Sequence, residues 1–268
     1  MRPFLHFAHA NGFPAGSYQQ LLGPLSLDYQ VLAIDRLGHH PQYPIAPNWK
    51  PLAQELLDYL EQQAGDQPVI GIGHSLGGVV TYMAALEQPE RFQQIILLDP
   101  PLMFGSDSWG LKVGKRFGFI DRITPAGITR GRRSHWPDLQ AAEENLRTKK
   151  LFRHFDPQAL RDYLQAGTEP ASQGGIQLRF QPQVELAIFR HLADHLTWSH
   201  RRLKVPTHLF YGLDSQLLNA ARRKRIEARG ITCSALAGSH MFPLEHPEAT
   251  RQALLKKMAE QAALVTPA

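Results

Sequence analysis

Residues 73–77 read Gly-His-Ser-Leu-Gly and place a serine between two glycines. They directly follow a β-branched apolar run, residues 69–72, and directly precede an apolar pattern with helical spacing. A G-x-S-x-G turn between a strand and a helix is typical of a nucleophile elbow, which projects the serine hydroxyl from a sharp bend. The bland alternative is a strand-to-helix turn that merely needs glycines. The flanking elements favour the first interpretation and make Ser75 a candidate nucleophile.

A serine hydroxyl becomes a good nucleophile only when a base removes its proton. The candidate base is His240, in the loop after the last predicted strand, although a surface histidine is the alternative. Two aspartates could orient it: Asp214, just after a strand that ends at Tyr211, and Asp99, at the end of an earlier strand. The chain order Ser75, Asp214, His240 favours Asp214 as the acid. Asp99 stays open as the alternative acid, or as a cap of the turn that follows it.

Acyl transfer also needs two backbone N–H donors for the charge that develops on the carbonyl oxygen. We expect one donor at Leu76, directly after the serine and at the start of a helix. We expect the other at Phe13, in the loop after the first predicted strand, where Gly12 lets the backbone approach the substrate. Asn11, Gly12 and His74 are therefore candidate substrate-binding residues.

Short apolar runs alternate with amphipathic segments along both ends of the chain. The alternation predicts βαβ crossovers and a parallel sheet in an α/β fold. At such a sheet, sites form at the carboxyl ends of the strands, where all the candidate catalytic residues fall. The predicted strands are residues 4–8, 31–34, 69–72, 95–98, 207–211 and 231–236, with helices at 52–60, 76–84, 217–229 and 247–263.

The alternation breaks after residue 101 and returns at 205. Residues 102–204 hold helical segments but no clear apolar strand run. We therefore predict a core of residues 1–101 and 205–268 with a helical lid of residues 102–204. Three of the four tryptophans fall in this lid. We expect some of its aromatic residues to form its own core and others, with Trp109 and Trp136 as candidates, to line an apolar acyl pocket over Ser75.

Composition excludes several classes of protein. An apolar share of 43% excludes a mainly disordered chain. The sequence has no apolar run of about 18 residues, so we expect no membrane-spanning helix. The single cysteine, Cys233, cannot form an internal disulfide, and the N-terminus lacks a signal-peptide pattern, so we expect a cytoplasmic protein. Residues 104–204 carry 17 Lys and Arg against 10 Asp and Glu. The net charge of this segment, +7, is larger than the net charge of the whole chain, +5. We predict that the lid faces an anionic substrate group or an acidic surface such as lipid headgroups, with simple solvation as the alternative.

Two further patterns carry weaker signals. His191 and His195 have an i, i+4 spacing that can bind a metal, but no third ligand accompanies them, so we expect no metal. Residues 222–225 read Arg-Arg-Lys-Arg on a predicted helix. Without a nucleic-acid-binding motif, a solvated helix face is the expected interpretation, and we expect no nucleic-acid partner.

Taken together, these motifs resemble the α/β-hydrolase superfamily over nearly the whole chain. Asn-Gly-Phe-Pro at 11–14 is similar to its oxyanion loop, and Asp-Arg-Leu-Gly-His at 35–39 to its Asp-x-x-Gly-His turn. Gly-His-Ser-Leu-Gly-Gly at 73–78 is similar to the elbow of its serine esterases, and Gly-Ser-His at 238–240 to its histidine loop. The resemblance implies a hydrolase without a cofactor, and it places the lid at residues 102–204.

The chain departs from the family pattern in three places. Asn11 stands where the family commonly has histidine, and Gly-Leu-Asp at 212–214 is one residue shorter than the common Gly-x-x-Asp. The chain also starts at the equivalent of the family's third strand, so we expect a doubly wound sheet of about six parallel strands, without the first N-terminal strands.

The resemblance implies a serine hydrolase that cleaves a carboxylic ester or thioester through an acyl-enzyme. The serine nucleophile excludes the aspartate-nucleophile branches of the family. Two alternatives stay open: the same triad used for C–C bond hydrolysis, acyl transfer or perhydrolysis, and a non-catalytic ligand-binding member of the fold. The expected partner is a small ester-like substrate, such as an apolar acyl compound with an anionic group, and no pattern predicts the oligomeric state.

Overall fold

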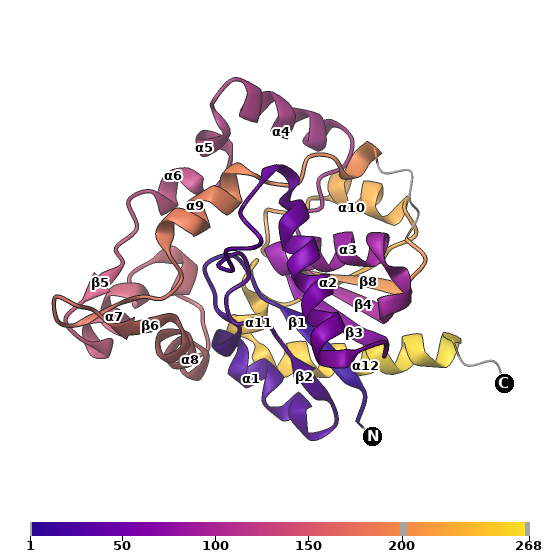
Figure 1. The fold of residues 1–268 in the computed structure, drawn as a ribbon, viewed down its shortest axis with the longest axis horizontal. Coiled ribbons are helices and arrows are strands. Elements are labelled where there is room, and N and C mark those ends of the chain that lie inside the picture. The colour runs from indigo at the N-terminus through magenta and orange to yellow at the C-terminus, as the bar shows by residue number, and fades with distance from the viewer. Residues whose placement is uncertain (1, 199–202, 266–268) are drawn as a thin grey trace.

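Six parallel strands form the central sheet of the computed structural model, which describes residues 2–198 and 203–265 (Figure 1). Their order across the sheet is β2-β1-β3-β4-β8-β9, and every neighbouring pair is parallel. The strands are β1 (Phe4–Ala8), β2 (Gln30–Leu32), β3 (Val69–His74), β4 (Phe92–Leu98), β8 (Thr207–Gly212) and β9 (Thr232–Leu236). Each overlaps a predicted run, so the prediction of a six-stranded parallel α/β sheet is confirmed.

Helices cover both faces of this sheet, as a doubly wound fold requires (Figure 1). Alternate side chains of β4 point to opposite faces, so Ile95 and Leu97 join one hydrophobic core whereas Ile96 and Leu98 join the other. The first core includes residues of α2 (Lys50–Ala64), α3 (Leu76–Glu87) and α10 (Ala220–Glu227). The second includes residues of α1 (Gln19–Leu22), α11 (Phe242–Glu245) and α12 (Pro247–Val265). None of the helices in the described ranges is long and apolar enough to cross a membrane.

Residues 102–204, which we call the insertion, connect β4 to β8. The insertion contains α4 (Ser106–Arg116), α5 (Ile120–Ile123), α6 (Ala126–Thr129), α7 (Leu139–Arg147), α8 (Pro157–Gly167) and α9 (Pro182–Arg190). It also contains a small antiparallel sheet of β5 (His135–Trp136), β7 (Ile176–Leu178) and β6 (Thr168–Pro170). The sequence did not predict this sheet, because strands of only two or three residues are too short to leave an apolar run.

Short 3-10 helices complete the description of the chain. They are η1 (Ala15–Tyr18), η2 (Pro24–Leu27), η3 (Pro47–Trp49), η4 (Pro89–Arg91), η5 (Lys150–Phe152) and η6 (Leu196–Trp198). The α7–α8 part of the insertion packs into the second core of the sheet, to which it contributes Phe152, Leu160 and Tyr163. Helices α4 and α5 lie at the upper edge of the molecule in Figure 1, and they contribute Leu111 and Ile120 to the first core.

Candidate active site

Ser75 occupies the tight turn between β3 and α3. Its φ of 53° and ψ of −115° are unfavourable for a residue with a side chain. Its N–H donates to the carbonyl of Leu98 at 2.9 Å, which ties the turn to β4. A Cβ atom on Gly73 would lie 2.4 Å from the Gly77 carbonyl oxygen, and one on Gly77 would lie 2.0 Å from the Ala8 carbonyl oxygen. The glycines are therefore needed because three backbone segments meet here, and their close approach fixes the strained serine.

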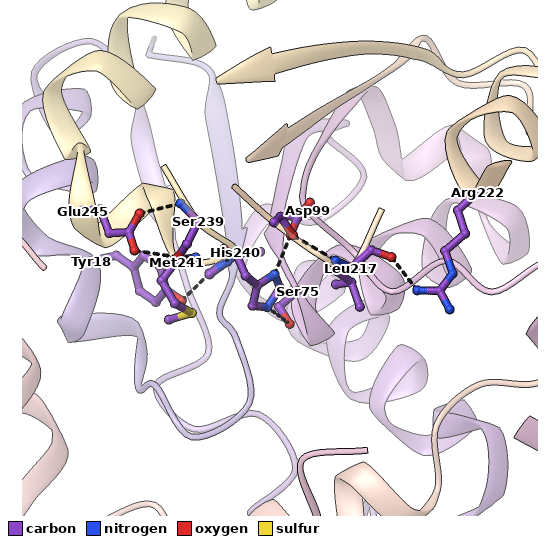
Figure 2. Close-up of polar contacts among 11 residues, drawn as sticks. Tyr18, Ser75, Asp99, Leu217, Arg222, Ser239, His240, Met241 and Glu245 are labelled. Carbon is purple, nitrogen blue, oxygen red and sulfur yellow. Dashed lines mark hydrogen bonds and ion pairs between the residues drawn. The ribbon is translucent and has the colours of Figure 1, made fainter. Parts of the chain in front are cut away.

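Three side chains form a hydrogen-bonded line at the carboxyl edge of the sheet (Figure 2). His240 Nε2 lies 3.0 Å from Ser75 Oγ, and His240 Nδ1 lies 2.7 Å from Asp99 Oδ2. The Asp99 carboxylate only accepts hydrogen bonds, so Nδ1 carries the proton and Nε2 is free to accept the proton of the serine hydroxyl. Asp99 is fully buried, whereas 32% of the His240 side chain is exposed. His240 and the partly exposed Ser75 are thus reachable from solvent, whereas Asp99 is not.

Asp99, and not Asp214, holds the histidine in this structure. The order of strands explains the difference, because β4, which ends beside Asp99, is the direct neighbour of β3. The strand before Asp214, β8, lies one position further from Ser75. Asp214 is exposed, and its backbone N–H donates to the Gly238 carbonyl at 3.0 Å. The structure therefore corrects the preference for Asp214 and supports the alternative acid, Asp99.

The loop after β8 nevertheless contributes to the site, through Ser215. Its hydroxyl donates to Asp99 Oδ2 at 2.5 Å, and the Asp99 backbone N–H donates to the Phe210 carbonyl at 2.7 Å. Asp99 has a φ of 43°, an uncommon value that these contacts hold in place. Sequence reasoning missed Ser215, which is marked only by its position directly after Asp214.

The loop that carries His240 is held by a carboxylate on α11 (Figure 2). The backbone N–H of Ser239 donates to Glu245 Oε2 at 2.7 Å, and its hydroxyl donates to Oε1 at 2.5 Å. The Ser239 hydroxyl also accepts the N–H of Met241 at 3.1 Å. One buried glutamate therefore fixes Ser239, and Ser239 in turn bonds to Met241 on the other side of His240. No sequence pattern singled out this glutamate.

Some of the backbone N–H groups around the serine bond to other parts of the backbone, and one is left to meet a substrate. Those of Ser75 and Gly77 donate to backbone carbonyls, that of Gly77 to His9 at 3.1 Å. Leu76 is the first residue of α3, and the first N–H groups of a helix have no intrahelical acceptor. The predicted second donor, Phe13, instead donates to the Ala10 carbonyl at 3.1 Å. Leu76 thus has the position expected of an oxyanion donor, whereas the N–H of Phe13 is engaged in a turn.

His74 and Trp136 are fully buried in this structure, so their burial does not support the prediction that they contact substrate. The indole N–H of Trp136 donates to Asn145 Oδ1 at 3.1 Å, within the packing of the insertion. Trp109 has the opposite environment, with 66% of its surface exposed on α4. The lining of an acyl pocket by these tryptophans therefore gains no support from their positions.

His74 instead connects two loops of the site. Its Nε2 lies 2.9 Å from the His240 carbonyl oxygen and its Nδ1 lies 2.7 Å from the Tyr18 hydroxyl. A carbonyl only accepts, so Nε2 carries the proton and Nδ1 accepts that of Tyr18. Burial lowers the pKa of His74 well below its ordinary value, which agrees with a neutral ring. Since the Tyr18 hydroxyl also accepts the N–H of Ala10 at 3.3 Å, the chain of bonds runs from the loop after β1 to the backbone of His240.

A buried ion pair of the insertion covers the loop with Asn11 and Gly12. Arg132 Nη1 lies 2.6 Å from Glu185 Oε2, and Arg132 also bonds to the Tyr163 hydroxyl. Asn11 Nδ2 donates to the Glu185 backbone carbonyl at 3.0 Å, and a Cβ on Gly12 would lie 3.0 Å from the Glu185 carboxyl carbon. Burial raises the pKa of the Glu185 carboxyl, and the charge of Arg132 opposes that rise. The candidate binding loop is therefore in direct contact with the insertion.

His191 and His195 do not share a helix face, because α9 ends at Arg190. Within residues 2–198 and 203–265, no three His, Cys, Asp or Glu side chains are grouped so as to hold a metal ion.

A strained serine between a parallel strand and a helix, with a histidine and a buried aspartate in line, is the site architecture of the α/β-hydrolase class. The comparisons with known proteins agree. The model of the alpha/beta hydrolase family matches residues 7–253, and the chain belongs to this family.

Individual relatives are more distant. Monoglyceride lipase of Rattus norvegicus is 27% identical over 114 residues, which cover 40% of this chain and 38% of that enzyme. The chain therefore matches well under half the length of this curated relative. Among solved structures, E-2-(acetamidomethylene)succinate hydrolase has a TM-score of 0.77 at 19% identity, covering 97% of this chain and 92% of that one. A thioesterase domain from the curacin biosynthetic pathway has a TM-score of 0.71 at 22% identity, covering 95% and 91%. These likenesses establish a shared fold.

Proposed function

We propose that this protein is a serine hydrolase that cleaves a carboxylic ester or thioester through an acyl-enzyme. The observation that carries the proposal is the line of Asp99, His240 and Ser75, with contacts of 2.7 and 3.0 Å. These distances lie within hydrogen-bond reach, as a nucleophile, its base and the acid that orients the base require. A ligand-binding protein without turnover would not need all three groups in this order.

In the proposed reaction, Ser75 Oγ attacks the substrate carbonyl carbon while His240 Nε2 takes the hydroxyl proton. The buried Asp99 stabilises the resulting imidazolium, and the N–H of Leu76 donates to the oxyanion. His240 then protonates the leaving alcohol or thiol, and water releases the acyl group from Ser75 by the reverse sequence. A second oxyanion donor at Phe13 requires its hydrogen bond to Ala10 to be exchanged for one to the substrate.

The substrate class follows from the relatives' names together with the insertion. A lipase and a thioesterase among the similar proteins support an acyl ester or thioester as the substrate. We propose that the insertion is a lid, because Asn11 bonds to Glu185 and Gly12 lies against its side chain. The cytoplasm is its proposed location, from the single free cysteine, Cys233.

The direct test is labelling with a fluorophosphonate probe, which reacts with an activated serine. We expect the wild-type chain and a Ser172→Ala control to be labelled, since Ser172 lies in an exposed turn of the insertion. Ser75→Ala should not be labelled and should not hydrolyse p-nitrophenyl esters, while its circular dichroism stays that of the wild type. Equal labelling of Ser75→Ala would refute the proposal. A wild type that is labelled but releases no acid from esters or thioesters would move the assignment to another reaction of the same triad.

A further inference from the structure

Large apolar side chains are exposed together on α4, on α5 and on the turn between them. Trp109 is 66% exposed, Phe117 72%, Ile123 53% and Phe119 36%. They include every aromatic residue among the large hydrophobic side chains exposed in the described parts of the chain. We call this region, residues 109–123, the α4–α5 surface. Contiguous exposed apolar groups of this kind mark interaction sites more often than isolated ones do.

The exposure belongs to one fixed face of α4. On its other face, Leu111 is buried and Lys115 bonds to the Asp194 carboxylate at 2.7 Å. The exposed positions Trp109 and Arg116 are seven residues apart, which places them on the same side of a helix. The rings of Phe117 and Phe119 are nearly parallel, with centroids 6.5 Å apart. The α4–α5 surface is therefore held outward by packing behind it.

Two acids lie at this surface, Asp121 within it and Asp107 just before it, and each is met by two arginines, so the region is positively charged. Asp107 lies 3.2 Å from Arg222 and 2.6 Å from Arg225, both on α10. The basic run of residues 222–225 thus borders the α4–α5 surface, which its sequence alone did not indicate.

The second acid shows the same excess. Asp121 lies 2.7 Å from Arg190 and also pairs with Arg130. The exposed Arg116 and Arg122 add further positive charge beside the aromatic residues. A partner that matches this region must offer both negative charge and an apolar layer.

We propose that the α4–α5 surface docks this protein on an anionic lipid bilayer. In this arrangement Trp109 and Phe117 enter the boundary between headgroups and acyl chains, while Arg116 and Arg122 meet lipid phosphates. Aromatic residues interleaved with cations, on a face with polar surroundings, are the composition of interfacial helices. A second copy of the chain fits less well, because a two-fold contact would bring two positive faces together.

The test measures co-sedimentation of the full chain with vesicles, in the Ser75→Ala background so that no lipid is hydrolysed. We expect binding to phosphatidylcholine vesicles that contain phosphatidylglycerol, little binding to phosphatidylcholine alone, and release by salt. Phe117→Ser should weaken the partitioning by about tenfold, and Arg116→Gln or Arg122→Gln by roughly fivefold each. The matched control is Leu27→Ser, which removes a side chain that is 77% exposed on η2. It should bind like the parent.

A second readout reports which residue enters the lipid. Trp49 and Trp136 are buried, and a Trp198→Phe background removes the fourth tryptophan. In that background a blue shift of tryptophan fluorescence on adding anionic vesicles should disappear in Trp109→Phe, while sedimentation persists. Equal binding to neutral vesicles, or equal weakening by Leu27→Ser, would overturn the proposal. So would a dimer in sedimentation velocity that Phe117→Ser dissociates, or binding to single-stranded DNA without binding to vesicles. These outcomes leave the fluorophosphonate result untouched, so docking and catalysis fail separately.

Discussion

The elbow around Ser75 and the α4–α5 surface are built in opposite ways. At the elbow, Gly77 has no room for a methyl group, because the Ala8 carbonyl lies 2.0 Å from where its Cβ would be. On α4, the space where a Cβ of Gly110 would lie is open to 4 Å. Chemistry at the sheet edge depends on backbone positions held by close contact, whereas the outer surface depends on the apolar area and charge it exposes. The elbow can be recognised in the sequence by a motif, whereas the α4–α5 surface can be recognised only by the types of residue it contains.

The largest expected effect tests which aspartate belongs to the rigid site. Asp99→Asn keeps the shape of the side chain but removes the charge that stabilises the His240 imidazolium, so kcat should fall by about 10³- to 10⁴-fold. Asp214→Asn changes an exposed side chain and should alter kcat by less than about twofold. Steady-state kinetics on one p-nitrophenyl ester compare the two. A larger loss of kcat in Asp214→Asn than in Asp99→Asn would instead assign the role of the acid to Asp214.

The second prediction compares the two glycines directly. Gly77→Ala should lower the free energy of unfolding by at least about 3 kcal/mol, because the added methyl group collides with backbone and not with a movable side chain. Gly110→Ala should raise it by about 0.5–1 kcal/mol, since alanine is the better helix former and its methyl meets nothing. Urea unfolding measures both. Similar stabilities of the two variants would mean that the backbone around Gly77 can move apart to accept a methyl group.

The sequence could predict the fold and part of the site for physical reasons that differ between residues. Ser75 and His240 were predictable because a tight turn and a strand end are local features of the chain. The choice between Asp99 and Asp214 depends on which strand lies beside β3, and that follows from sheet order rather than from chain order. The packing of Trp136 in a hydrophobic core was not predictable, because composition does not say whether an aromatic ring faces a substrate or its own core.

The core also contains histidines that burial keeps neutral, and this predicts how its stability depends on pH. Both ring nitrogens of His6, on β1, are buried and lack a hydrogen-bond partner among the described residues. Burial lowers its pKa to about 3, so below its ordinary value of 6.5 the unfolded chain binds a proton that the folded chain does not. Stability should therefore be full above pH 6.5 and fall as the pH drops towards 3, by about 1.4 kcal/mol per pH unit for this group.

His6→Leu tests that assignment. Between pH 6 and 4 the variant should show a slope of unfolding free energy against pH that is smaller by about 1.4 kcal/mol per unit. His154→Leu, at an exposed position of the insertion, is the control and should leave the slope unchanged. Urea unfolding at several pH values gives both slopes. An unchanged slope in His6→Leu would show that His6 does not contribute to the loss of stability in acid.

The smallest expected effect concerns two buried tyrosine hydroxyls. Tyr18→Phe removes the hydroxyl that donates to His74 Nδ1 and accepts the Ala10 N–H. Losing these two hydrogen bonds loosens the groups that position His240 and the loop after β1. We expect kcat to fall by about three- to tenfold with little change in KM, since hydrogen bonds of this kind contribute about 1 kcal/mol.

Tyr163→Phe is the matched variant in the insertion, where the hydroxyl bonds to Arg132 instead. Its loss leaves the Arg132–Glu185 pair above Gly12 less constrained, so we expect KM to rise about two- to threefold while kcat stays near the wild-type value. Steady-state kinetics with one ester separate the two constants. If Tyr163→Phe lowered kcat as Tyr18→Phe does, the Arg132–Glu185 ion pair would belong to the rigid site at the edge of the sheet. The part of the insertion that acts only as an outer surface would then be limited to α4 and α5.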